Sequence, residues 1–207
     1  MRLTKQEILE NHTRLLEREA VYKRHGYDPA KAIAFVLSKA MPLPGRILEI
    51  GTGKGRFLAA LLKKVPSVTT VDLDPAEQRL ARMNVAFEGM SRKARFVHAD
   101  AAHLPFADAR YDAVVSMNAV HHFEDWKAVL EEALRVLKPG GKLVLADFND
   151  NGFRVFDRIH EWEGRKHHRS PYRVPEIVRF LRKRGCRVRT ANRDCQWVAV
   201  ARRIIHT

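Results

Sequence analysis

The chain has 207 residues, of which 45% are hydrophobic, and its formal net charge is +14. This length and composition are typical of one globular domain that buries a sizeable core. We see neither an apolar run of membrane-spanning length nor a leader-like N-terminal segment. The two cysteines, Cys186 and Cys195, are too few for a disulfide framework or a thiolate metal site. We therefore expect a cytoplasmic protein with reduced thiols and no membrane partner.

The positive charge is concentrated in the last part of the chain. Residues 1–150 contain 23 Lys and Arg against 19 Asp and Glu, whereas residues 151–207 contain 15 against 5. A basic segment of this kind favours an anionic partner such as RNA or a phosphorylated metabolite, but a solvated basic surface explains it equally well. Nothing in this pattern indicates an oligomeric state.

The elements are predicted from capping patterns and hydrophobic periodicity. A capping box at Thr4–Glu7 opens a helix that extends to about Arg24, and Asp28-Pro29 opens a second helix. From Gly45 onward, strands and helices alternate, which is typical of a parallel, doubly wound α/β sheet. The predicted strands are 47–50, 68–71, 94–98, 111–117 and 142–147; predicted helices include 54–64, 125–137 and 175–184, and 187–190 with 196–202 form an antiparallel hairpin. We predict a long irregular segment from Asp147 to Arg173.

A glycine-rich loop follows the first predicted strand, in the segment Arg46–Phe57, which reads RILEIGTGKGRF. Gly51, Gly53 and Gly55 allow a tight turn and a close approach of the backbone to a ligand, and the helix that follows offers free N–H groups. A dinucleotide-binding loop has the spacing G-x-G-x-x-G, whereas this loop has G-x-G-x-G preceded by Glu49. The spacing therefore disfavours a nicotinamide dinucleotide.

Polar residues also end the next three predicted strands. Asp72, Asp100 and Asn118 stand at these positions, and the carboxyl ends of parallel strands meet at the ligand-binding edge of the sheet. Asp74 and Pro75 have the pattern that starts a helix, which leaves Asp72 without a local structural role. Its position suits a carboxylate that accepts hydrogen bonds from both hydroxyls of a ribose.

Together with the VLKPGG segment before the fifth strand, these residues resemble the class I S-adenosylmethionine-dependent methyltransferases over residues 28–148. The resemblance is nearest to the small-molecule branch that includes the ubiquinone- and menaquinone-biosynthesis methyltransferases. It implies S-adenosylmethionine as the cofactor and a Rossmann-like, seven-stranded sheet of order 3-2-1-4-5-7-6. It also implies a single methyltransferase domain over residues 1–207, composed of an N-terminal helical lid (1–40), a cofactor-binding core (45–148), a substrate-covering insertion (149–174) and a C-terminal helix and hairpin (175–207).

The resemblance further implies the residues that bind the cofactor, namely Glu49, Gly51, Gly53, Asp72, Leu73, Asp100, Ala101 and Asn118. Glu49 suits the α-amino group and Asp72 the ribose. Leu73 would lie against the adenine ring. Asp100 would accept from the adenine amino group, while the Ala101 N–H would donate to a ring nitrogen.

The sequence gives less information about the molecule that accepts the methyl group. Methyl transfer from a sulfonium is an in-line displacement that depends on positioning, and a general base matters only if the nucleophile must lose a proton. His122 is the candidate base, because it follows Asn118 by four residues and imidazole titrates near neutral pH; His121 or His122 could instead cap or pack beneath the 125–137 helix. We predict a small, anionic acceptor. The alternatives are an RNA methyltransferase that uses the basic C-terminal segment, and a non-catalytic nucleic-acid-binding module.

Two further groups of residues have alternative interpretations. Tyr22 and Tyr27 either face the site from the lid or are half-buried packing residues. A run of metal-ligand residue types, His160-Glu161-x-Glu163 with His167-His168, lacks the H-E-x-x-H spacing. We therefore predict no metal.

Overall fold

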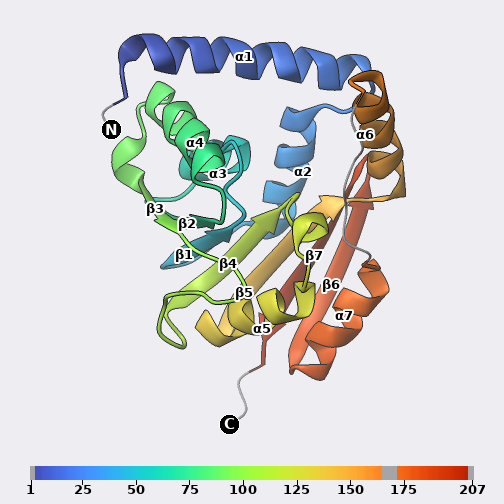
Figure 1. Cartoon of the computed structure of the whole chain (residues 1–207). Coiled ribbons are helices and arrows are strands. Elements are labelled where there is room, and N and C mark those ends of the chain that lie inside the picture. The colour runs from blue at the N-terminus through green and yellow to red at the C-terminus, as the bar shows by residue number, and fades with distance from the viewer. Residues whose placement is uncertain (1–2, 165–171, 205–207) are drawn as a thin grey trace.

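A seven-stranded sheet lies at the centre of the computed structural model, which describes residues 3–164 and 172–204 (Figure 1). Its strands are β1 (Ile47–Ile50), β2 (Val68–Asp72), β3 (Ala94–His98), β4 (Tyr111–Met117), β5 (Leu137–Phe148), β6 (Cys186–Arg193) and β7 (Gln196–Arg203). The α-helices are α1 (Lys5–Arg24), α2 (Pro29–Ala40), α3 (Arg56–Leu62), α4 (Pro75–Phe87), α5 (Trp126–Val136), α6 (Asp150–Trp162) and α7 (Val174–Lys183), and two 3-10 helices are η1 (Ser91–Lys93) and η2 (Val120–His122). His167 and His168 lie outside the described residues.

The strand order is β3-β2-β1-β4-β5-β7-β6, which confirms the predicted order. β1 is paired in parallel with β2 on one side and with β4 on the other, whereas β7 is antiparallel to β5 and β6. From β1 the chain runs outward to β2 and β3 and then returns to β4 on the opposite side. The connections therefore diverge at the carboxyl ends of β1 and β4, which is where such sheets form a ligand-binding crevice.

Helices cover both faces of the sheet with separate apolar clusters. α5 and α7 pack on one face, while α2, α3, α4 and α6 contribute to the cluster on the other (Figure 1). Val114 belongs to one cluster and Val115 to the other, because successive side chains of a strand point to opposite faces. Within the described residues, no helix is both long and apolar enough to cross a bilayer.

The two N-terminal helices begin as predicted. Thr4 and Glu7 form the capping box of α1, and the side chain of Asp28 caps α2. α1 lies along the outside of α4 and reaches α6 at its far end (Figure 1). A hydrogen bond of 2.7 Å from Asn11 Nδ2 of α1 to Asn84 Oδ1 of α4 joins the two helices.

The structure corrects three predicted boundaries. α3 begins only at Arg56, because Gly53 and Gly55 have φ values of +47° and +76° that keep the loop out of helical geometry. β5 begins at Leu137, which pairs with Tyr111, so the predicted break at 138–141 lies within this strand. The segment predicted to be irregular contains the helix α6.

The sequence signal for α6 is recognisable in retrospect. Val155, Phe156 and Ile159 are buried at helical spacing, and the Asn149 side chain caps the helix by accepting from the Gly152 N–H. We missed the helix because aromatic and basic residues alternate along the segment. The basic residues that follow, Arg165, Lys166 and Arg169, lie outside the described residues.

Candidate functional site

The glycine loop joins β1 to α3 and is shaped by close packing. Gly51 has a φ of +82°, and a Cβ there would collide with Ala119. Gly53 differs, because a Cβ at this position would meet no atom within 4 Å. The backbone at Gly53 is therefore open to a neighbouring cavity, as a loop that cradles a ligand requires.

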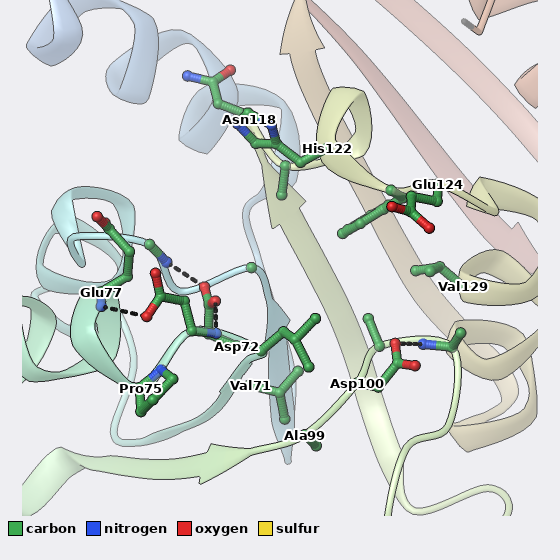
Figure 2. A pocket seen from close by; sticks show the side chains of 18 of the residues that line it. Val71, Asp72, Pro75, Glu77, Ala99, Asp100, Asn118, His122, Glu124 and Val129 are labelled. Carbon is green, nitrogen blue, oxygen red and sulfur yellow. Dashed lines mark hydrogen bonds between the residues drawn. The ribbon is translucent and has the colours of Figure 1, made fainter. Parts of the chain in front are cut away.

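A cleft of about 1030 Å³ lies at the carboxyl ends of β1 to β4, in front of this loop (Figure 2). In Figure 2, Asp72 and Asp100 face the same space from two strand ends, and Asn118 and His122 lie together at the end of β4. The cleft is lined by every predicted site residue except Glu49, namely Gly51, Gly53, Asp72, Leu73, Asp100, Ala101, Asn118 and His122. The structure thus brings together eight residues that were singled out from four separate segments.

Asp72 has a local role that the sequence did not indicate. Its Oδ2 accepts from the Gly53 N–H over 2.7 Å, and its Oδ1 accepts from the Asp74 N–H over 2.9 Å. The expectation that Asp72 has no structural role is therefore wrong, because its carboxylate ties the glycine loop to the start of α4. A carboxylate has about four lone-pair sites, so two remain for hydroxyl groups in the cleft.

We expect Asp72→Ala to weaken binding of S-adenosylhomocysteine by on the order of 2–3 kcal/mol, since charge-assisted bonds to the ribose would be lost. The melting temperature without ligand should fall as well, because two backbone N–H groups lose their acceptor. Calorimetry and thermal unfolding measure the two effects. Asp28→Ala is the matched control: it also removes a carboxylate that accepts from two backbone N–H groups, but at α2. Unaltered affinity in Asp72→Ala would mean that Asp72 stabilises the loop and does not bind the ribose.

Asp100 presents an ionised carboxylate at the other end of the cleft. Its Oδ1 accepts from the Ala102 N–H over 2.9 Å, and its Oδ2 lies 3.1 Å from Nδ1 of His103. The backbone hydrogen bond, followed by the contact with His103, lowers the pKa of Asp100 below its ordinary value. Leu73, which also lines the cleft, leaves 66% of its surface exposed and so offers an apolar surface to a flat ring.

Glu49 is the one predicted residue that lies apart from the cleft. It is 1% exposed, and its Oε2 accepts from the Thr70 hydroxyl over 2.5 Å. Its Oε1 is buried and has no hydrogen-bond partner among the described residues. Burial, with a smaller contribution from the nearby charge of Asp72, raises the pKa of Glu49 to about 8. At neutral pH this side chain is therefore mostly a neutral acid beneath the loop.

The side chain of Asn118 makes hydrogen bonds to two distant parts of the chain. Its φ is +54°, its Oδ1 accepts from Nε2 of Gln196 over 2.6 Å, and its Nδ2 donates to the Tyr27 hydroxyl over 3.1 Å. Burial raises the pKa of Tyr27, so its hydroxyl stays protonated. The Asn118 side chain therefore fixes the loop after β4 against the connection between α1 and α2 and against β7.

The two adjacent histidines of η2 occupy different environments. His121 is buried, and its Nδ1 lies 2.7 Å from Oδ1 of Asp147, whose Oδ2 accepts from the His121 N–H. His122 is exposed and lines the cleft. His121 is therefore a packing residue, which was one of the two roles considered for these histidines beside that of a general base.

A second cavity of about 380 Å³ lies behind the glycine loop, between it and α1, α2 and α6; we call it the chamber. Five Tyr and Phe residues line it, namely Tyr22, Tyr27, Phe57, Phe148 and Phe156. The cleft and the chamber meet at a junction, because six residues line both cavities, namely Gly51, Gly53, Lys54, Glu77, Asn118 and His122. Tyr22 and Tyr27 both line the chamber, and both are also packing residues, since Tyr27 is buried in the core and the half-buried Tyr22 packs against it.

Most residues of the chamber were not predicted from the sequence. Phe148 and Phe156 come from β5 and α6, and Arg56 enters from the first position of α3. Arg56 directly follows the glycine loop in the sequence, and this position could have identified it as a site residue. Among the described residues, no group of three or more His, Cys, Asp or Glu side chains could hold a metal ion.

Residues 48–145 match the family model described as a methyltransferase domain. The matched segment contains the glycine loop, all the strand-end residues that line the cleft, and most of the five strands from β1 to β5. It lies within a sheet whose order is the one expected for class I methyltransferases. Residues 48–145 are thus similar to a methyltransferase domain, within a sheet of the class I order. S-adenosylmethionine is the cofactor of this class.

Two curated relatives are demethylmenaquinone methyltransferases. The one from Thermus thermophilus is 37% identical over 118 residues, which cover 57% of this chain and 52% of that protein. The one from Deinococcus radiodurans is 39% identical over 118 residues, which cover 56% of this chain and 48% of that protein. The chain thus spans about half the length of these relatives.

Solved structures resemble the methyltransferase domain in its fold. A methyltransferase from Thermotoga maritima has a TM-score of 0.67 at 22% identity, and the match covers 95% of this chain and 98% of that one. A SAM-dependent methyltransferase from Aquifex aeolicus has a TM-score of 0.66 at 21% identity, covering 86% and 94%. These likenesses extend over nearly the whole fold, beyond the segment that the family model matches.

The residues of the domain fit S-adenosylmethionine. Gly53 leaves room for close approach, and Asp72 retains acceptor capacity for a ribose. In the same cleft, Leu73 offers an exposed apolar surface that suits an adenine ring, and the ionised Asp100 offers an acceptor that suits its exocyclic amino group.

Proposed function

We propose that this chain is an S-adenosylmethionine-dependent methyltransferase that acts on a small molecule. The observation that supports this proposal is the junction of the cleft and the chamber at the glycine loop, Asn118 and His122. A cofactor in the cleft and an acceptor in the chamber would meet there. The names of the two demethylmenaquinone methyltransferases support a small-molecule acceptor.

In this proposal the strand ends hold the cofactor. Asp72 accepts from the ribose, Leu73 lies against the adenine, and Asp100 with the Ala101 N–H binds the adenine edge. Gly51, Gly53 and Asn118 flank the methionyl part, and Glu49 supports it from beneath the loop. When bound, the cofactor supplies an activated methyl group. Residues 1–40 and 149–174 act as the lid and the covering segment of residues 45–148, and 175–207 complete the sheet.

The chain's own residues then position the acceptor and manage its proton. The aromatic side chains of the chamber pack against the acceptor and hold it next to the junction. His122 accepts a proton from an acceptor nucleophile that must lose one. A small acceptor fits a chamber of about 380 Å³, which is within the range of small-molecule sites.

Binding and transfer assays test this proposal. We expect calorimetry to detect S-adenosylmethionine and S-adenosylhomocysteine binding, and NAD binding no stronger than background. Tritiated-methyl transfer from S-adenosylmethionine into fractionated cell extract should then label small metabolites. Label in RNA would instead favour an RNA methyltransferase that uses the basic C-terminal segment. Cofactor binding without any transfer would favour a non-catalytic module, and a preference for NAD would refute the proposal.

A further inference from the structure

Arg56 carries a buried nitrogen without a hydrogen-bond partner. Its side chain lines the chamber, and its Nε donates to Oε1 of Glu19 over 3.3 Å. Its Nη2 is buried and makes no hydrogen bond to any residue that the structure describes. Buried polar groups are nearly always paired, and charged groups most of all. The described residues therefore leave one donor of this guanidinium unpaired, on a side chain that lines the chamber.

A second arginine that lines the chamber, Arg18, differs from Arg56 because its terminal nitrogens are paired with a carboxylate. The Cζ atoms of Arg18 and Arg56 lie 4.9 Å and 5.5 Å from the centre of the Tyr22 ring. Both terminal nitrogens of Arg18 contact the carboxylate of Glu163, the residue that follows α6. Arg18 is therefore committed to joining α1 to the end of α6, whereas Arg56 retains donor capacity.

The walls of the chamber favour a flat apolar body next to this charge. The Phe156 ring lies 5.2 Å from Tyr22 and 5.0 Å from Tyr27, and Tyr27 lies 5.4 Å from Phe148, all measured between ring centres. Tilted and edge-on aromatic surfaces of this kind pack well against another ring. The chamber thus combines aromatic side chains with two guanidinium groups, of Arg18 and Arg56, and with the charged residues Lys54 and Glu77 at its wall.

We propose that the chamber binds an acceptor made of a flat ring and a carboxylate, and that Arg56 binds the carboxylate. A guanidinium presents planar, parallel N–H groups that match the two oxygens of a carboxylate. This inference rests on the proposed function and names the substrate class of the same site. S-adenosylmethionine also carries a carboxylate, in its amino-acid part, so the test must separate the two sources of this group.

Calorimetry on the full chain saturated with S-adenosylhomocysteine provides the test, with trans-cinnamate and the neutral cinnamamide as probes. The wild type should bind cinnamate about tenfold or more tightly than cinnamamide, because a charged hydrogen bond is gained. Arg56→Gln should abolish this preference, and Arg56→Lys should restore part of it by returning the charge. Arg18→Gln is the matched control, which removes the neighbouring guanidinium and should retain the preference.

The outcomes distinguish this inference from the proposed function. We expect the affinity of Arg56→Gln for S-adenosylhomocysteine to stay within about twofold of the wild type. A large loss of that affinity, together with no preference for cinnamate in the wild type, would assign Arg56 to the cofactor's carboxylate and overturn the inference. Normal cofactor binding without a cinnamate preference would overturn it as well. Absence of cofactor binding by the wild type would instead refute the proposed function.

Discussion

His122→Asn should lower the turnover number by about 10²- to 10⁴-fold, the usual contribution of a positioned general base. His122 is exposed at the junction of the cleft and the chamber, where an acceptor and a cofactor would meet. Affinity for S-adenosylhomocysteine should change little. Wild-type turnover should also fall as the pH is lowered and the imidazole becomes protonated, and the variant should lose this dependence. Steady-state rates between about pH 5 and 8 measure both effects.

The adjacent histidine is a matched control for this experiment. His121→Asn removes a side chain that contacts the buried carboxylate of Asp147, so its main effect should be on stability. Turnover per folded molecule should fall much less than in His122→Asn. If His122→Asn instead unfolds more easily while its folded fraction turns over at the wild-type rate, His122 is a packing residue rather than a base.

The cofactor-free protein should become less stable as the pH rises from about 5 to 8, and Glu49 should account for part of this loss. The pKa of Glu49 is raised from 4.5 to about 8 by burial, so the folded chain retains a proton that the unfolded chain releases. Stability from this group is present below pH 4.5 and is lost as the pH approaches 8. The slope approaches about 1.4 kcal/mol per pH unit between these values.

Glu49→Gln isolates this contribution, because glutamine keeps the acceptor for the Thr70 hydroxyl but does not titrate. Urea unfolding of both proteins at several pH values should show a stability difference that shifts by on the order of 3 kcal/mol, in favour of the variant, from pH 5 to 7.5. A difference that is constant with pH would mean that Glu49 titrates normally in the folded chain.

The periodicity of the chain was sufficient to predict most of the fold. Alternating strands and helices indicated the doubly wound sheet, and Thr4 and Asp28 marked the two N-terminal helices as the structure has them. Polar residues at strand ends indicated the cleft, because parallel strands bring their carboxyl ends to one edge. These features are local in sequence, so a short segment contains the whole signal. The order of β5, β7 and β6 came from family resemblance rather than from any local pattern.

The chamber and the state of Glu49 were decided only by tertiary structure. Tyr27 and Asn118 are 91 residues apart, and Arg18 and Glu163 are 145 apart, yet each pair is joined in the fold. No short segment contains such a pair, so neither periodicity nor spacing can predict it. The residue type of Glu49 and its position in the motif do not reveal whether its side chain is solvated or buried. Its neutral state depends on the burial that surrounding elements impose, since desolvation disfavours the charged form.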